Sequence, residues 1–243
     1  MAHLAASKFI NTIISEIAKH REKPTKVLEI GSHDVNGSIR TKVMQTINVS
    51  EYIGIDLSSG PGVDVVGSGH EVALGLGRFD WVISSECLEH NPFWKETLYN
   101  MRKHVAHDGF VIVSCATLGR VEHGTARTDP KSSPGTSDVG WNYYMNLEAA
   151  DFPEDFLSSF KAHRFWTNEY SRDLYFVGGV VGLPNLEQVG ELFTEFKPTQ
   201  SLMFTLFVGL PLAVFRRVFS EKLYQEVAVR YLKLGRPFKK LVQ

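Results

Sequence analysis

The chain of 243 residues contains few cysteines and lacks a long hydrophobic run. Only Cys87 and Cys115 occur, both within apolar stretches and without the spacing of a zinc site. We therefore expect buried thiols in a reducing compartment. No run of about 18 apolar residues is present, so no membrane-spanning helix is expected. The first ten residues lack a basic start followed by a sustained apolar segment, so we expect no signal peptide and a cytoplasmic location.

The chain as a whole also lacks an excess of either positive or negative charge, because its net charge is −1. Its distribution is uneven, however. Residues 202–243 hold eight Lys or Arg and two Asp or Glu, a net charge of +6, which leaves −7 on the remainder. An acidic body argues against a nucleic-acid partner. The content of 43% hydrophobic and 22% charged residues is ordinary for a globular protein.

Two common phosphate-binding motifs are missing. A dinucleotide dehydrogenase favours Gly-x-Gly-x-x-Gly after its first strand, but residues 31–37 read GSHDVNG, with His33 at the middle glycine position. This disfavours NAD. No Gly-Lys-Ser or Gly-Lys-Thr occurs, which excludes a P-loop.

Three short apolar runs, each followed by a small or acidic residue, are the most informative feature that is present. They are VLEIGS at 27–32, YIGID at 52–56 and FDWVISS at 79–85. Ligands of open parallel sheets bind at the carboxyl ends of the strands. The Gly-Ser turn, the acid and the Ser-Ser-Glu at these ends suit a ligand with a ribose, an adenine and a charged amino-acid tail.

Hydrophobic periodicity predicts an α/β fold. We expect strands at 26–31, 52–56, 63–66, 79–84, 110–115, 162–169 and 173–182, and helices at 4–20, 38–46, 92–105, 147–160 and 216–234. The turn at 170–172 is short enough to make the last two strands antiparallel. Residues 118–146 show no period, and a loop of that length is usually functional or mobile.

With these motifs, the chain resembles the class I S-adenosylmethionine-dependent methyltransferases. The resemblance rests on VLEIGS, YIGID, FDWVISSECLEH at 79–90 and the Asp108-Gly109 turn before FVIVS, and it covers about residues 24–182. It implies a Rossmann-like seven-stranded sheet of order 3-2-1-4-5-7-6 with an antiparallel last strand and flanking helices. The LEH motif after the fourth strand is typical of a subgroup that acts on small molecules, sugars and lipids.

The resemblance also implies cofactor contacts. Glu29 would orient the loop amides and the amino end of S-adenosylmethionine. Asp56 would accept the ribose hydroxyls, and Leu57 would pack on the adenine. The remaining implied contacts are Gly31, Ser32 and His33 at the methionine portion, Gly69 and His70 beside the adenine amine, and Ser85 and Glu86 under the methionyl group. His33 stands where the family usually has a second glycine.

Two histidines are the candidates for catalysis. His90 follows the fourth strand, and His123 lies in the long loop. A histidine near neutral pH can help to remove a proton from a hydroxyl acceptor, although a positioning or structural role is slightly favoured for His90. Planar donors and aromatic rings suited to a sugar or its phosphate lie in the same loop, namely Arg120, Arg127, Tyr143 and Tyr144. The histidines and acids show no metal-ligand spacing, so no metal is expected.

We expect a methyltransferase domain at 1–185, with an acceptor lid at 117–146, and a basic helical extension at 186–243. Residues 202–243 could pack on the body or mediate a homodimer, or they could lie on a membrane surface beside anionic lipids. The predicted function is O-methylation of a carbohydrate or glycoconjugate hydroxyl. The alternatives are N- or C-methylation of another small metabolite, a non-catalytic cofactor-binding subunit and a membrane-recruited scaffold.

Overall fold

The computed structural model describes the chain except for residues 1–3, 20–22, 36, 72–76, 198–204 and 235–243. Its core is one seven-stranded sheet of order β3-β2-β1-β4-β5-β7-β6. The strands are β1 (Thr25–Ile30), β2 (Val49–Asp56), β3 (Val65–Val66), β4 (Phe79–Ser85), β5 (Val105–Ala116), β6 (Ala162–Asn168) and β7 (Asp173–Gly179). β1 to β5 pair in parallel, whereas β7 is antiparallel to both of its neighbours. The predicted strand order is therefore confirmed.

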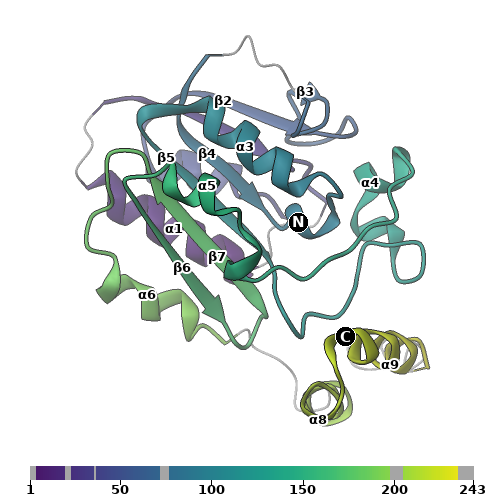
Figure 1. Cartoon of the computed structure of the whole chain (residues 1–243). Helices are drawn as coiled ribbons and strands as arrows, with labels where there is room; N and C mark the ends of the chain where they lie inside the picture. The colour runs from purple at the N-terminus through teal and green to yellow at the C-terminus, as the bar shows by residue number, and fades with distance from the viewer. Residues whose placement is uncertain (1–3, 20–22, 36, 72–76, 198–204, 235–243) are drawn as a thin grey trace.

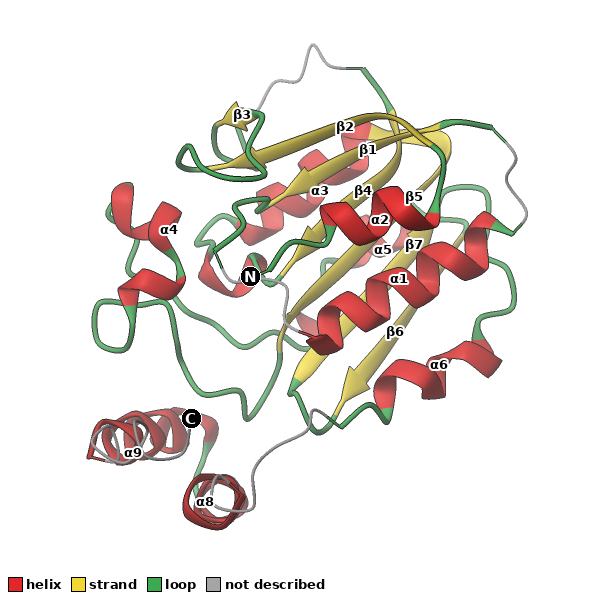
Figure 2. Ribbon diagram, turned by 180° about the vertical axis from the view of Figure 1, so that it is seen from behind, coloured by secondary structure: helices red, strands yellow, loops and turns green. Residues whose placement is uncertain are grey.

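Helices cover both faces of this sheet. One face carries α1 (Leu4–Ala18), α2 (Arg40–Thr46) and α6 (Glu187–Thr194), while the other carries α3 (Trp94–His104) and α5 (Glu154–Ser158). Figure 2 looks onto the face with α1, and Figure 1 onto the face with α3. β4 and β7 are buried along their whole length, because both of their faces lie under helices. This burial explains why their sequences are apolar rather than alternating.

Three sequence expectations about these elements were wrong. Residues 147–160 form the short turn η3 (Ala149–Asp151) and the one-turn helix α5, because Phe152 and Pro153 are extended. Residues 216–234 are split at Phe219, which is also extended, into α8 (Leu210–Val218) and α9 (Glu221–Leu234). The expected turn at Asp108-Gly109 lies inside β5, whose register with β4 shifts there.

The chain between β5 and β6 leaves the carboxyl edge of the sheet and returns to it. We call its residues 117–146 the lid; it contains the short turn η2 (Pro130–Ser132) and the one-turn helix α4 (Pro134–Asp138). The turn η1 (Leu88–His90), which follows β4, holds the returning chain, because Met145 donates its backbone N–H to Glu89 O at 2.9 Å. Figures 1 and 2 show the lid beyond the ends of the strands.

The C-terminal extension, which also contains the short π-helix η4 (Thr205–Gly209), packs on the lid through α9. Tyr224 is buried and donates its hydroxyl proton to Gly119 O at 2.9 Å. By contrast, α8 leaves the side chains of Leu210, Val214 and Val218 more than half exposed. Residues 198–204 and 235–243 of the predicted basic extension lie outside the described residues. Homodimerisation and membrane contact remain predictions.

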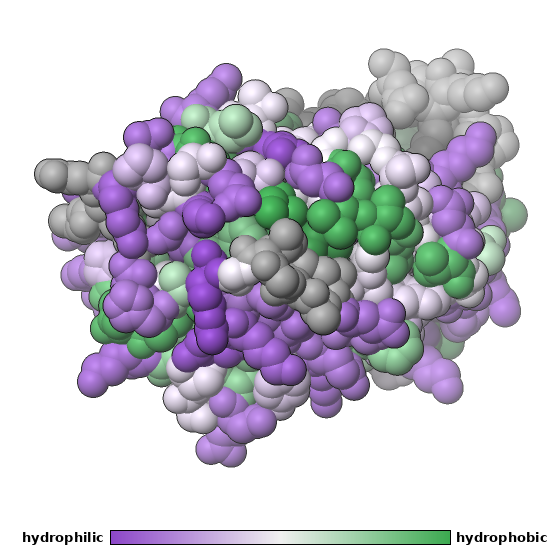
Figure 3. Space-filling model, turned by 90° about the horizontal axis from the view of Figure 1, so that it is seen from above, coloured by the Kyte–Doolittle hydropathy of each residue, from purple (hydrophilic) through white to green (hydrophobic). Residues whose placement is uncertain are grey.

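Within the described parts of the chain, every helix is too short or too polar to cross a membrane. The surface seen from above is mostly hydrophilic, and its largest group of hydrophobic residues gathers near the middle, with smaller groups toward the lower left and the right of the view (Figure 3).

Candidate active site

The loop after β1 passes very close to the chain that leaves β4. Gly31 has φ +83°, and a Cβ added to it would lie 2.6 Å from Cβ and 2.8 Å from Sγ of Cys87. Only glycine fits both this backbone angle and this contact. The predicted methionine-portion segment therefore lies between the ends of β1, β2 and β4, and Ser32 is buried there.

Glu29, the acid of the first motif, points toward β2. It is buried and accepts a hydrogen bond of 2.6 Å from the hydroxyl of Tyr52. Burial raises the pKa of Glu29 from 4.5 to about 7, although the Tyr52 hydrogen bond opposes the shift. The loop amides are held by other groups: Gly31 and Ser32 donate to Ile55 O. The predicted contact with the cofactor's amino end stays a prediction.

Asp56 ends β2 beside this loop. One carboxylate oxygen accepts the backbone N–H of His33 at 3.0 Å, and the other accepts that of Leu57 at 2.8 Å. A carboxylate offers about four lone-pair sites, so each oxygen keeps capacity for another donor. The lid lies directly over it, because a Cβ on Gly135 of α4 would be 2.6 Å from Asp56 Oδ1 and 3.3 Å from Leu57 Cβ.

Several buried polar atoms around Asp56 lack hydrogen-bond partners within the described structure. These atoms are Ser32 Oγ, His33 Nδ1 and Ser58 Oγ. Buried polar groups are normally paired, so several unpaired polar atoms in one place mark a candidate site for a polar ligand.

The loop after β3 joins an aromatic cluster that includes the lid. His70 stacks on Phe93 at a centroid distance of 4.2 Å, and the lid residue Trp141 lies 6.2 Å from His70 and 5.5 Å from Phe93. Gly69 is held by α3, since Asn100 Nδ2 of that helix donates to the Gly69 carbonyl oxygen at 2.7 Å. The segment that the resemblance places beside an adenine thus forms an aromatic surface at the sheet edge.

The end of β4 carries buried charge. Glu86 is only 4% exposed and has φ +52°, an uncommon conformation for a residue other than glycine. The adjacent Ser85 pairs its hydroxyl with that of Ser114 at 3.1 Å. Arg120 lies 3.7 Å from Glu86 and forms a 2.7 Å ion pair with the fully buried Asp173 of β7. These carboxylates raise the pKa of Arg120 against the effect of burial.

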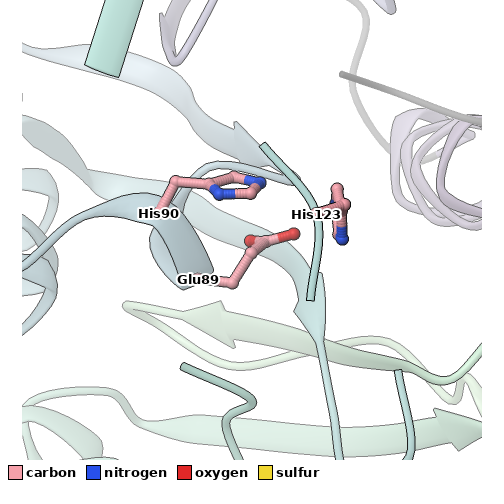
Figure 4. A group of neighbouring side chains, drawn as sticks. All are labelled: Glu89, His90 and His123. Atoms are coloured by element: carbon pink, nitrogen blue, oxygen red, sulfur yellow. The ribbon is translucent and has the colours of Figure 1, made fainter. Parts of the chain in front are cut away.

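His90 and His123, the two candidates for catalysis, come together beside Glu89 (Figure 4). The imidazole rings stand perpendicular at a centroid distance of 4.9 Å, and Tyr144 lies 5.4 Å from His90 and 5.1 Å from His123. Gly124 makes this approach feasible, because a Cβ there would lie 2.8 Å from His90 Cε1. We call Glu89, His90 and His123 the Glu-His-His cluster.

Glu89 and His90 are buried and His123 is partly buried, and burial dominates the electrostatics of the cluster. It raises the pKa of Glu89 from 4.5 to about 8, with a further contribution from Glu86. It lowers the pKa of His90 well below 6.5 and that of His123 to about 4. Both imidazoles are therefore neutral at pH 7.

The predicted acceptor-binding residues have partners within the chain. Arg120 is held as described above, and Arg127 bridges Glu122 and Glu226 of α9. The Tyr143 hydroxyl lies 3.2 Å from Met145 Sδ, and the Tyr144 ring covers the cluster. The fold thus brings Tyr144 to the histidines, whereas the guanidinium of Arg127 is held by two glutamates.

Sequence reasoning missed Glu89, Tyr52 and Asp173. Glu89 lies within the FDWVISSECLEH motif, which was the available signal. By contrast, no motif marked Asp173 as a partner of Arg120.

Comparison with known proteins agrees with this geometry. Residues 1–163 match the family model described as a methyltransferase domain. No curated protein sequence matches the chain.

Solved structures are similar at low sequence identity. The CurJ carbon methyltransferase is 16% identical over 74% of this chain and 56% of its own, with a TM-score of 0.52. The N-terminal domain of EvdMO1, solved with S-adenosylhomocysteine bound, is 15% identical over 71% of this chain and 80% of its own, with a TM-score of 0.50. An N1-methyltransferase from Burkholderia thailandensis is 15% identical over 72% and 79%, with a TM-score of 0.48. The first two likenesses show the fold, and the family match shows that this chain belongs to the methyltransferase domain family.

Proposed function

We propose that the protein transfers a methyl group from S-adenosylmethionine to a hydroxyl oxygen of a carbohydrate or glycoconjugate. Membership of the methyltransferase domain family supports the reaction class. The cofactor is supported by the Asp56 carboxylate, which accepts two backbone N–H groups and can accept further hydrogen bonds. It is also supported by the EvdMO1 domain, which carries S-adenosylhomocysteine on a similar fold.

The residues at the sheet edge fit this cofactor. The spare lone pairs of Asp56 suit two ribose hydroxyls. Polar atoms of Ser32, His33 and Ser58 have no hydrogen-bond partner among the described residues, and they suit a polar ligand. The stacked His70 and Phe93 offer a surface for an adenine ring. Because α4 contacts Asp56, we expect this part of the lid to move when the ribose binds.

The Glu-His-His cluster is the observation that carries the choice of a hydroxyl acceptor. Glu89 and His90 follow β4 a few residues after Ser85 and Glu86, where the resemblance places the methionyl group, and His123 reaches them from the lid. S-adenosylmethionine supplies a methyl group on a sulfonium, and the carbon–sulfur bond breaks with its electron pair on sulfur as a carbon–oxygen bond forms. A hydroxyl must also lose its proton. His90 and His123 present polar atoms that can orient this hydroxyl, and Tyr144 can stack on a sugar ring.

Calorimetric titration with S-adenosylhomocysteine tests the cofactor. We expect binding by the native chain and a loss of at least tenfold in affinity in Asp56→Asn. The matched control is Asp155→Asn on α5, where the carboxylate accepts a hydrogen bond from the hydroxyl of Tyr99. A folded native chain that does not bind would overturn the proposal.

The second test uses S-adenosylmethionine labelled with ¹³C in the methyl group, offered with pools of nucleotide sugars and glycans. The carbon chemical shift of the product distinguishes O-, N- and C-methyl groups. We expect a methyl ether whose formation falls at least tenfold in His90→Gln. An N- or C-methyl product would replace the O-methylation proposal. Cofactor binding with no turnover on any pool would favour a non-catalytic subunit.

A further inference from the structure

The Glu-His-His cluster has more ligand atoms than the protein itself uses. One ligand atom from each of Glu89, His90 and His123 lies within 4.8 Å of the others. Neither carboxylate oxygen of Glu89 has a hydrogen-bond partner in the described parts of the chain, and the same holds for Nδ1 of His90. Both side chains are more than nine-tenths buried, and Figure 4 shows them directed toward one another. Leaving buried polar atoms without hydrogen-bond partners is costly, so a ligand that pairs with these atoms would be favoured here.

His123 is oriented as a ligand. Its Nδ1 lies 3.1 Å from the carbonyl oxygen of Val121, which can only accept, so Nδ1 carries the proton. The lone pair is then on Nε2. Metal-binding histidines commonly donate their second ring nitrogen to a backbone carbonyl in this way.

We infer that Glu89, His90 and His123 form a binding site for a divalent transition-metal cation, which holds the acceptor hydroxyl. Two imidazoles and one carboxylate suit Zn²⁺ and its neighbours rather than Mg²⁺, which prefers oxygen ligands. Ligand atoms about 2.1 Å from one ion are at most about 4.2 Å apart, so small side-chain rotations close the site. Three protein ligands leave a coordination position open.

The site would deepen the proposed function, on which its role with the acceptor rests. An acceptor hydroxyl bound at the open position would lose its proton to solvent more readily, since a bound cation lowers the pKa of a coordinated oxygen. The resulting oxygen would then attack the methyl carbon, and sulfur would keep the electron pair of the broken bond.

The first test measures metal binding alone, with the full chain purified in chelator. After equilibration with Zn²⁺ or Co²⁺ and removal of excess metal, we expect one equivalent per chain and visible absorption bands with Co²⁺. Glu89→Gln and His90→Gln should each weaken binding at least tenfold. His107→Gln, which changes a side chain that is 91% exposed, is the matched control. Equimolar Mg²⁺ should not compete.

Absence of stoichiometric metal on the native chain would overturn the inference. Metal binding that is unchanged in both Glu89→Gln and His90→Gln would also overturn it, because the binding would then be adventitious. Titration with S-adenosylhomocysteine checks that each variant keeps its fold and cofactor site.

The second test separates this inference from the proposed function. Metal binding with no methyl transfer would leave the site standing and overturn the proposed reaction. Methyl transfer that is unchanged by a chelator would leave the reaction standing and overturn the metal's role.

Discussion

Glu29 is a buried acid whose ionisation opposes folding. Its pKa is about 7 in the folded chain, against an ordinary 4.5, mainly because of burial. A folded state that binds the proton more tightly has its full stability below pH 4.5 and loses stability as the pH rises toward 7. The loss at pH 8 is about 3 kcal/mol, at 1.36 kcal/mol for each pKa unit.

We therefore predict that Glu29→Gln removes this pH dependence. The neutral amide can still bond Tyr52, so the variant should gain about 2–3 kcal/mol relative to the native chain between pH 5 and pH 8. Urea denaturation at both pH values measures the difference. An equal effect of the substitution at both pH values would contradict the assignment.

Arg120 was predicted to bind the acceptor, but its geometry indicates a structural role. It pairs with Asp173 and also donates to Ser171 O at 2.6 Å. Removing one partner of a buried ion pair leaves the other charge uncompensated.

We predict that Arg120→Met lowers the free energy of unfolding by about 3–5 kcal/mol without any acceptor present. Urea denaturation measures this change. The control is Arg164→Met, whose exposed pair with Glu187 spans 3.4 Å and should matter by less than about 1 kcal/mol. A stable Arg120→Met variant that loses only acceptor affinity would restore the original interpretation.

At the scale of elements, α9 and the lid behave as one unit. Glu122 donates its backbone N–H to Gln225 Oε1 at 2.8 Å, and Gln225 Nε2 donates to Arg120 O at 2.7 Å. Gly119 N–H also donates to Glu221 of α9 at 3.2 Å. These bonds hold the first part of the lid, which contributes His123 to the cluster.

We predict that Gln225→Ala loosens the lid and leaves the sheet intact. Hydrogen exchange measured by mass spectrometry should accelerate at least tenfold in peptides covering residues 119–124, with no change in β4 or β5. Lys222→Ala, at an exposed position of α9, is the matched control. Lid protection that is the same in both variants would show that α9 does not hold the lid.

The limits of sequence reasoning also lie at the scale of elements. Strands such as β4 could be predicted because burial on both faces imposes an apolar run. The helix predicted at 147–160 failed because Pro153 and its neighbour are extended. The break between α8 and α9 at Phe219 has no proline to mark it. The turn there instead allows α9 to contact the lid, which is a tertiary contact.

At the scale of the whole molecule, the sheet order could be predicted, whereas the neighbours of the lid could not. Asp56 and Gly31 each follow a recognisable strand, so parallel pairing alone brings them to one edge. His123 reaches His90 only because the lid returns to η1 and α9 holds its outer side. Contacts of this kind depend on tertiary packing and leave little periodicity in the sequence.

The direction of β7 also constrains how the chain can change in length. Because β7 is antiparallel to β5, its first residue, Asp173, lies opposite Ala116 at the carboxyl edge. Side chains alternate faces along a strand, so a shift by one residue would turn this carboxylate to the opposite face of the sheet. An insertion or deletion of a single residue in the turn at 169–172 that shifted this register would thus separate Asp173 from Arg120, even though surface turns elsewhere usually tolerate such changes.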